Sequence, residues 1–402
     1  MKPSSPARRR LLVAGLSAPI ASRVWAQDDA WARVERAARG QTVRFNAWAG
    51  SERVNAYLQW VAGLMRERHG IQLEHVKVTD AAEVVKRVRA EKAAGRTRGG
   101  SVDLVWINGE NFLAMKREGL LFGPFAEALP NHAFVDTIGK PTTRIDFSEP
   151  VQGMEAPWGM AQLTFFCDSV RVPRPPASAA DLLDWAKSNP RRFTYPRVPQ
   201  FHGTTFVKQV LSELHADRSA LYRPMTSETF DRLTPALWQY LDALHPHLWR
   251  EGKQFPASDA VMRQMLADGE LLISLTFNPN EAASQIAAKT LPATVQSYQH
   301  TIGTIGNTHF VAIPFNSAAT DAARVVANFL LSPTAQARKA DISVWGDPTV
   351  LAVERLPAEY RAAFAAVAAP GQVRHGAPVL PEPHASWVEP LERAWAARYG
   401  VA

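Results

Sequence analysis

Near the start of the chain, one hydrophobic period gives way to another. Residues 43–48 alternate between apolar and polar side chains, which is the period of a strand half-buried in a sheet. From Val54 onward, apolar side chains recur every three or four residues, which is the period of an amphipathic helix. The pattern therefore predicts a strand over 43–48, a short polar turn that contains Gly50, and a helix over 52–68.

The same order of strand, turn and helix recurs along the chain. Apolar runs predict further strands over 73–78, 102–107, 271–277 and 310–314, and helices are predicted to follow from Asp80, Asn108, Ser178, Phe201 and Asn278. Because strands that alternate with helices build mostly parallel sheets with helices on both faces, the sequence predicts an α/β fold. At this chain length, two such lobes are more economical than one very large sheet.

The first 26 residues have the features of an export signal. Basic residues at Lys2 and 8–10 precede an apolar run over 11–22, and the segment ends in small residues at Ala26. This order is typical of a secretory signal peptide, and the apolar run is shorter than the roughly 20 residues that span a bilayer. Residues 8–10 also resemble the twin-arginine export motif, so the twin-arginine and general secretory routes both stay open. No cysteine follows the predicted cleavage site, and we expect a mature chain without a lipid anchor.

Most of the positive charge of the chain lies in that predicted signal peptide. The formal net charge is +7, and residues 1–26 contribute +5 with no acidic residue, which leaves +2 on 27–402. A balance this close to neutral argues against a nucleic-acid partner. The chain has one cysteine, Cys167, which excludes an intramolecular disulfide and any multi-thiolate metal site. It lies in an apolar run, and we predict that it is buried.

Several longer motifs resemble those of one protein family. They are SVDLVWINGENF at 101–112, APWGMAQLTFFCD at 156–168, PPASAADLLDW at 175–185, DGELLIS at 268–274, and the stretch from NTHFVAIPF to LLSPTAQ at 307–336. Over nearly its whole length after the signal peptide, the chain resembles the periplasmic solute-binding proteins of ATP-binding-cassette (ABC) importers. WGDPTVL at 345–351 adds a resemblance to the branch named for thiamine transport.

This resemblance implies the two-lobed fold of type II periplasmic binding proteins, in which each lobe is a mostly parallel sheet flanked by helices. Residues 157–167 would cross from the first lobe to the second, and 309–314 would return. Lobe one would hold 27–157 and 312–342, and lobe two would hold 158–311 and 343–402. A small solute would lie in the cleft between the lobes, and a membrane permease with its ATPase would receive it. We expect a periplasmic monomer with no cofactor, metal or nucleic-acid partner.

In such a fold the turns after strands face the cleft, which predicts the residues that line it. From lobe one and the first crossing they are Trp48, Ser51, Glu52, Asn108, Glu110, Asn111 and Trp158, and from lobe two they are Thr204, Thr205, Phe277, Asn278 and Glu281. An aromatic face beside a carboxylate suits a small cationic solute. The helix start near Thr204 and Thr205 would suit an anion, and a phosphorylated cationic vitamin would satisfy both.

Several of these residues also have a structural explanation. Trp48 could pack in the core at the rim of the cleft, and Ser51 and Glu281 could cap their helices. Glu52 and Glu110 lie near helix starts, where the helix dipole favours a negative charge even without a ligand. The two threonines could be helix caps as well.

The sequence therefore predicts a non-catalytic exported receptor that presents thiamine, or a related cationic or phosphorylated compound, to its permease. A polyamine, a sugar or an amino-acid-like solute stays open as an alternative ligand. The alternative of another class is an exported hydrolase or ligase with Glu52 and Glu110 as acid and base. The sequence contains no G-x-S-x-G elbow, G-x-x-x-x-G-K-[ST] loop or H-E-x-x-H motif that would favour an enzyme. His245 and His247 could be a metal pair, but we interpret them as exposed loop histidines.

Overall fold

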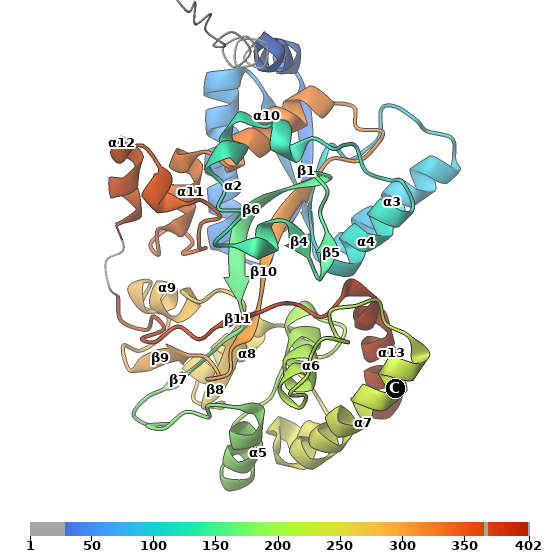
Figure 1. Ribbon diagram of the computed structural model, residues 1–402. Coiled ribbons are helices and arrows are strands. Elements are labelled where there is room, and N and C mark those ends of the chain that lie inside the picture. Colours follow the sequence, from blue (N-terminus) through green and yellow to red (C-terminus); the bar gives the residue numbers. More distant parts are fainter. Residues whose placement is uncertain (1–28, 366–368, 401–402) are drawn as a thin grey trace, which may run out of the picture.

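The computed structural model describes residues 29–365 and 369–400, which form two lobes joined by long strands (Figure 1). The predicted signal peptide over 1–26 lies outside the described residues. None of the described helices combines the length and the apolar character that crossing a bilayer requires.

The larger sheet has six strands in the order β11-β10-β3-β1-β2, with β6 also paired to β10. These strands are β1 (Thr42–Trp48), β2 (Gln72–Val78), β3 (Leu104–Ile107), β6 (Glu155–Gln162), β10 (Thr304–Ala312) and β11 (Val379–Leu380). β2 and β3 flank β1 in parallel, as the alternating pattern predicts, whereas β10 runs antiparallel to β3 and β6.

Helices cover this sheet in the first lobe (Figure 1). They are α2 (Glu52–Leu64), α3 (Ala81–Ala93), α4 (Gly109–Arg117), α10 (Thr320–Leu330) and α11 (Pro333–Ala340). The alternating residues Val43, Phe45 and Ala47 share one core with Val54 and Leu58, which belong to the apolar face of α2. The apolar residues of the predicted strand and of the predicted helix therefore pack in the same core.

The second lobe contains a three-stranded sheet in the order β8-β7-β9. Its strands are β7 (Thr164–Asp168), β8 (Ile273–Thr276) and β9 (Val295–Tyr298). Both pairs are antiparallel, which differs from the mostly parallel sheet predicted for this lobe. The reason is the direction of entry, because β7 starts at the crossing with Thr164 opposite Thr276, the last residue of β8.

Helices from distant parts of the sequence surround the smaller sheet. They are α5 (Ala179–Ser188), α6 (Phe201–Glu213), α7 (Ser227–Leu244), α8 (Asp259–Ala267), α9 (Glu281–Ala287) and α13 (Val388–Tyr399). The final helix α13 contributes Leu391 and Trp395 to the same core as β7 and α6. The end of the described chain is therefore part of the second lobe.

The crossing between the lobes consists of β6 and β10, which run side by side (Figure 1). They pair from Gly306 opposite Gln162 to Ala312 opposite Glu155. The sequence predicts only the last part of β10 as a strand, because 304–309 is rich in polar residues and glycine. Those residues are nevertheless nearly all buried, since the crossing strand lies against both lobes.

The segment after α11 stays with the first lobe. Trp345, Val350, Leu351 and Leu356 belong to the same core as β1 and α2. The predicted boundary assigns 343–402 to the second lobe, whereas the structure packs the chain as far as Leu356 on the first. Burial of these apolar side chains accounts for the difference.

The single cysteine of the chain, Cys167, lies in β7 as a free and buried thiol. Burial raises the pKa of this thiol to about 12, so it stays protonated at neutral pH. The sequence-based prediction of a buried core residue is confirmed at this position.

Candidate functional site

A cavity of about 300 Å³ lies between the lobes, where β1, β3 and β8 end. Nine of the twelve predicted residues line it, and they are Trp48, Ser51, Asn108, Glu110, Asn111, Thr204, Phe277, Asn278 and Glu281. Three do not, because Glu52 is exposed outside the cavity and both Trp158 and Thr205 are buried behind its wall.

The three exceptions have local reasons. Glu52 is the first residue of α2 and is exposed, so the structure does not bring it together with Glu110 as an acid–base pair. The Trp158 ring packs behind Trp106, with the ring centroids 4.9 Å apart. The Thr205 hydroxyl donates to a backbone carbonyl one turn earlier in α6, at 2.8 Å.

Aromatic side chains line the cavity from both lobes. Trp48 ends β1, and its ring meets Trp106 of β3 nearly at a right angle, with centroids 6.4 Å apart. Phe201 and Phe277 face each other from the second lobe at 5.1 Å. Sequence reasoning missed Trp106, although it lies two positions before the predicted Asn108 and therefore on the same face of the chain.

Capping explains neither Ser51 nor Glu281. Ser51 occupies the N-cap position of α2, yet its side chain accepts no capping hydrogen bond. Glu281 is the first residue of α9, and its Oε1 accepts from Arg263 at 2.8 Å and from Gln285 at 2.9 Å. Ser51 therefore keeps its hydroxyl available at the cavity wall, whereas Glu281 is already ion-paired.

The start of α6 is capped by a residue that sequence reasoning did not select. Gln200 Oε1 accepts the backbone N–H groups of His202 and Gly203, at 2.8 and 3.2 Å. The Thr204 hydroxyl donates to Glu392 Oε1 at 2.7 Å. Because these N–H groups already have an acceptor, this helix start has less to offer an anion than the sequence suggested.

Three carboxylates face the cavity from three helices. They are Asp80 at the N-cap of α3, Glu110 in the first turn of α4 and Glu392 in α13, and we call them the carboxylate side. Burial, with smaller contributions from the negative charges of Glu392 and Asp80, raises the pKa of Glu110 to about 7 against the opposing effects of a backbone hydrogen bond and the charge of Lys208. Burial also raises the pKa of Glu392. Glu110 therefore holds a proton at a higher pH than an exposed glutamate does.

Two cationic side chains also line the cavity, and each has a carboxylate partner. Lys208 Nζ donates to Glu382 Oε2 at 2.7 Å, and both side chains are buried. The Lys208 ammonium also lies 4.2 Å from the ring centroid of Phe147. Arg263 pairs with Glu281. These cations are therefore committed to the protein rather than to an anionic solute.

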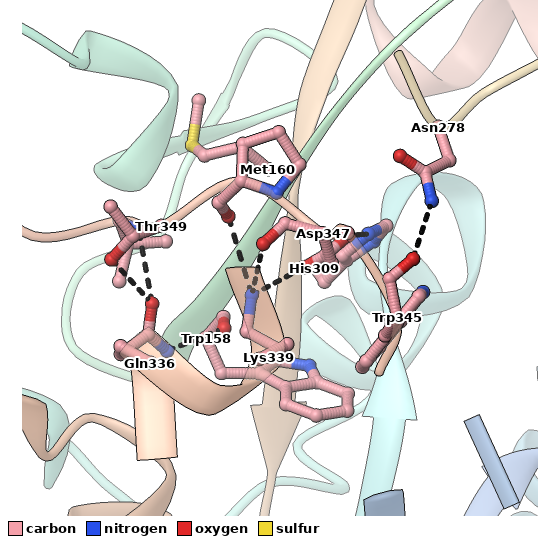
Figure 2. A network of polar contacts seen from close by, with 12 residues as sticks. Trp158, Met160, Asn278, His309, Gln336, Lys339, Trp345, Asp347 and Thr349 are labelled. Carbon is pink, nitrogen blue, oxygen red and sulfur yellow. Dashed lines mark hydrogen bonds and ion pairs between the residues drawn. The ribbon is translucent and has the colours of Figure 1, made fainter. Parts of the chain in front are cut away.

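Figure 2 shows a buried ionic network centred on Asp347, on Lys339 of α11 and on His309 of β10. Asp347 and His309 also line the cavity. Lys339 donates to a carboxylate oxygen of Asp347 and, at 3.3 Å, to the carbonyl of Pro348. His309 Nε2 lies 3.0 Å from the other Asp347 oxygen. Burial opposes ionisation of Asp347, but the charges of Lys339 and His309 hold its pKa below the usual value.

The same network fixes a loop that forms part of the cavity floor. Gln336 donates to the Trp158 carbonyl at 2.7 Å and accepts from the Thr349 hydroxyl at 2.7 Å (Figure 2). Trp345 and Asp347, from the same loop, line the cavity. The motif over 345–351 that carried part of the family resemblance therefore has a structural role beside the cavity.

Hydrogen bonds join this loop to the second lobe, and we call these contacts the α9 bridge. Arg53 of α2 donates to the Ile342 carbonyl at 3.0 Å and to the Ser284 carbonyl of α9 at 2.7 Å. The Ser284 hydroxyl donates to Ile342 at 2.9 Å, and Asn280 donates to the Gly346 carbonyl at 2.8 Å. The α9 bridge thus connects the lobes through neutral backbone acceptors.

The prediction that His245 and His247 are exposed loop histidines is wrong for His245. His245 is buried, its Nε2 lies 2.7 Å from the Tyr195 hydroxyl, and burial lowers its pKa to about 4. Its neighbours are aromatic, which explains why a histidine beside Pro246 packs inward. Within residues 29–365 and 369–400, no group of three or more His, Cys, Asp or Glu side chains is arranged to hold a metal ion.

Residues 59–368 match the family described as bacterial extracellular solute-binding protein. The chain is also 51% identical over 371 residues to Protein YnjB of Escherichia coli (strain K12), which covers 92% of this chain and 94% of that protein. The branch named for thiamine transport stays a prediction.

Solved structures of binding proteins share the fold. The periplasmic binding protein AfuA of Actinobacillus pleuropneumoniae, with fructose-6-phosphate bound, matches with a TM-score of 0.61 at 13% identity over 90% of this chain and 99% of that one. The spermidine/putrescine substrate-binding protein PotD of Streptococcus pneumoniae matches with a TM-score of 0.58 at 15% identity over 90% and 96%. The predicted two-lobed type II fold is therefore confirmed.

Proposed function

We propose that this chain, which belongs to the family of bacterial extracellular solute-binding proteins, captures a small cationic solute between its lobes and delivers it to the permease of an ABC importer. The observation that carries the proposal is the carboxylate side, where Asp80 and Glu110 of one lobe and Glu392 of the other face a shared cavity. A cation held there would contact both lobes. Contacts to both lobes favour the closed state, which contacts to one lobe would not do.

Aromatic rings support the same choice of solute. Trp48 and Trp106 lie on the wall of the first lobe, and Phe201 lies on the wall of the second. A desolvated cation over an aromatic face gains about 2 kcal/mol, and a flat solute also buries apolar surface against such rings. Thiamine combines a fixed positive charge with flat heteroaromatic rings, and it is the solute we favour.

A phosphate group finds less support than a cation. Lys208 and Arg263 already pair with carboxylates, and the first N–H groups of α6 already bind Gln200. We therefore place unphosphorylated thiamine ahead of its phosphates, and a polyamine ahead of a sugar. Delivery would take place in the periplasm by a monomer, with the permease and its ATPase as partners.

Isothermal titration calorimetry of the mature protein tests this order. Thiamine, thiamine phosphate, putrescine, glucose and γ-aminobutyrate are titrated separately at neutral pH. We expect heat with thiamine, weaker binding in Glu110→Gln, and unchanged binding in the matched control Glu52→Gln, whose carboxylate is exposed outside the cavity. Binding of glucose alone would contradict the proposal for a cationic solute.

Recovery of the solute tests receptor against enzyme. After prolonged incubation, thiamine that is bound and then released by denaturation should return chemically unchanged, as measured by mass spectrometry. Turnover would instead favour the hydrolase or ligase alternative. The exposed position of Glu52 already removes the acid–base pair that this alternative named.

A further inference from the structure

The cavity between the lobes is lined by like charges on its carboxylate side. Glu110 of α4 and Asp80 at the start of α3 come from the first lobe, and Glu392 of α13 comes from the second. All three line the same cavity of about 300 Å³. Their mutual repulsion acts directly against closure, because it grows as the lobes approach.

The positive charge of Lys208, which lines the same cavity, already has a carboxylate partner. The Lys208 ammonium donates to Glu382 Oε2 at 2.7 Å, and Glu382 Oε1 also accepts from Asn307 at 3.1 Å. Behind α4, Asp146 accepts the backbone N–H of Gly109 at 2.6 Å and adds a further acidic group next to Glu110. The three acids of the carboxylate side therefore share one lysine that already has a partner.

Charged groups on the other walls of the cavity are paired with one another. His202 lies 3.5 Å from Asp259, and Arg263 lies 2.8 Å from Glu281. On the floor, His309 and Lys339 both contact Asp347. These pairs leave the carboxylate side as the part of the cavity with excess negative charge among the described residues.

We infer that the empty receptor closes only when the carboxylate side takes up a proton, and that a cationic solute takes the place of that proton. Glu110 is the group we assign to this proton, because its side chain lines the same cavity as acids of both lobes. When the solute binds, the Glu110 carboxyl loses its proton to solvent and the solute's positive charge replaces it. The second half of the inference rests on the proposed function, whereas the first half concerns the empty protein alone.

Small-angle X-ray scattering of the empty mature protein tests the first half. The radius of gyration is measured from about pH 5 to about pH 9, which covers both protonation states of a carboxyl with a raised pKa. We expect a smaller radius at acid pH, a larger one at alkaline pH and a midpoint near the Glu110 pKa of about 7. A radius that does not change with pH overturns the inference.

Single Glu→Gln substitutions test whether Glu110 is the group that binds the proton. Glu110→Gln should keep the small radius at every pH, whereas Glu52→Gln, a matched change at an exposed helix start, should keep the transition of the unchanged protein. The inference is overturned if Glu110→Gln shows the same transition as the unchanged protein. It is also overturned if the transition is lost only in Glu155→Gln, which changes a buried carboxylate of β6. If circular dichroism shows that Glu110→Gln is unfolded, Glu392→Gln takes its place, with the same expected loss of the transition.

Calorimetry with thiamine hydrochloride tests the second half. Titration at pH 7 in phosphate and in Tris, whose ionisation heats differ, gives the number of protons released. We expect proton release when thiamine binds, because the raised pKa of Glu110 leaves this carboxyl partly protonated near neutral pH. Binding with no proton release overturns the exchange. Absence of thiamine binding refutes the favoured solute instead, and the scattering result is independent of it.

Discussion

On its α9 side the cavity is closed by hydrogen bonds, and on its carboxylate side it is closed by groups that repel one another when ionised. Arg53 and Ser284 meet at 2.7 Å through neutral backbone acceptors, so the α9 bridge holds at any pH near neutrality. Glu110 and Glu392 line the same cavity, and Lys208, which lines it as well, is already paired with Glu382. The two sides thus favour closure to different degrees.

This difference indicates where the solute controls the lobes. A ligand shifts the equilibrium between open and closed states only by its differential affinity for them. The α9 bridge consists of contacts between protein groups alone, so it lowers the free energy of the closed state in general. A cation gains most on the carboxylate side, where Asp80 and Glu110 meet Glu392, and its gain there exists only in the closed state.

The largest effect on stability is expected in the buried ionic network of Lys339, Asp347 and His309. Lys339→Ala leaves Asp347 as a buried charge without its ammonium partner, which typically costs about 3–5 kcal/mol. The free energy of unfolding, measured with urea, should fall by that amount. Lys187→Ala removes an exposed lysine from a surface ion pair and should change it by less than about 1 kcal/mol. Equal losses would mean that the network does not stabilise the first lobe.

Removal of the α9 bridge should have the next largest effect. Arg53→Ala deletes hydrogen bonds to Ile342 and Ser284 and should cost the closed state about 1–3 kcal/mol. Thiamine affinity should therefore fall about tenfold or more, and the empty protein should show a larger radius of gyration even at acid pH. Arg66→Ala, which changes an exposed arginine two residues beyond the end of α2, should change neither measurement. Unchanged affinity in Arg53→Ala would show that the bridge is not used.

A smaller effect is expected on the aromatic wall. Trp48→Ala removes a ring that lines the cavity and should weaken thiamine binding by about tenfold, from the loss of a cation–aromatic contact. The melting temperature of the empty protein should fall little, because the ring is only partly buried. Trp185→Ala on α5 gives a matched control away from the cavity. A loss of stability as large as the loss of affinity would mean that Trp48 belongs to the core.

The smallest effect is expected at Glu155 of β6, as a change in how the melting temperature depends on pH. Neither carboxylate oxygen of Glu155 has a hydrogen-bond partner, and burial next to Asp146 raises its pKa well above the usual value. A raised folded pKa means that stability falls as pH rises from the unfolded carboxyl pKa to the folded one. Glu155→Gln removes this titration, so its melting temperature relative to the unchanged protein should increase from acid to alkaline pH. Parallel melting curves at all pH values would contradict the assignment.

The sequence predicted which strand ends and helix starts surround the site. It did not predict which side chains face the cavity and which lie buried behind its wall. The change of period at Gly50 located β1 and α2, and Asp80 caps α3 as its position suggests. Trp158 of β6 was predicted to face the cleft, but Trp106 of β3 occupies that wall and covers it. Both strands pair with β10, and which of the two tryptophans faces the cavity depends on the layers packed behind them.

The sequence did not predict which charged groups share the cavity, because they come from distant parts of the chain. Glu392 lies on the final helix, nearly 300 residues after Glu110 in the sequence, and lines the same cavity because α13 packs on α6. Lys208 lies two turns inside α6, and its partner Glu382 follows β11. No spacing in the sequence relates these residues, so their electrostatic coupling emerges only in the folded chain.

The buried thiol of Cys167 makes this protein suited to optical sensing. Since its pKa of about 12 and its burial in β7 keep it unreactive, a cysteine introduced at the rim of the cleft would be the one site that a maleimide dye labels under native conditions. A fluorophore attached there would report lobe movement directly, without removal of the natural cysteine.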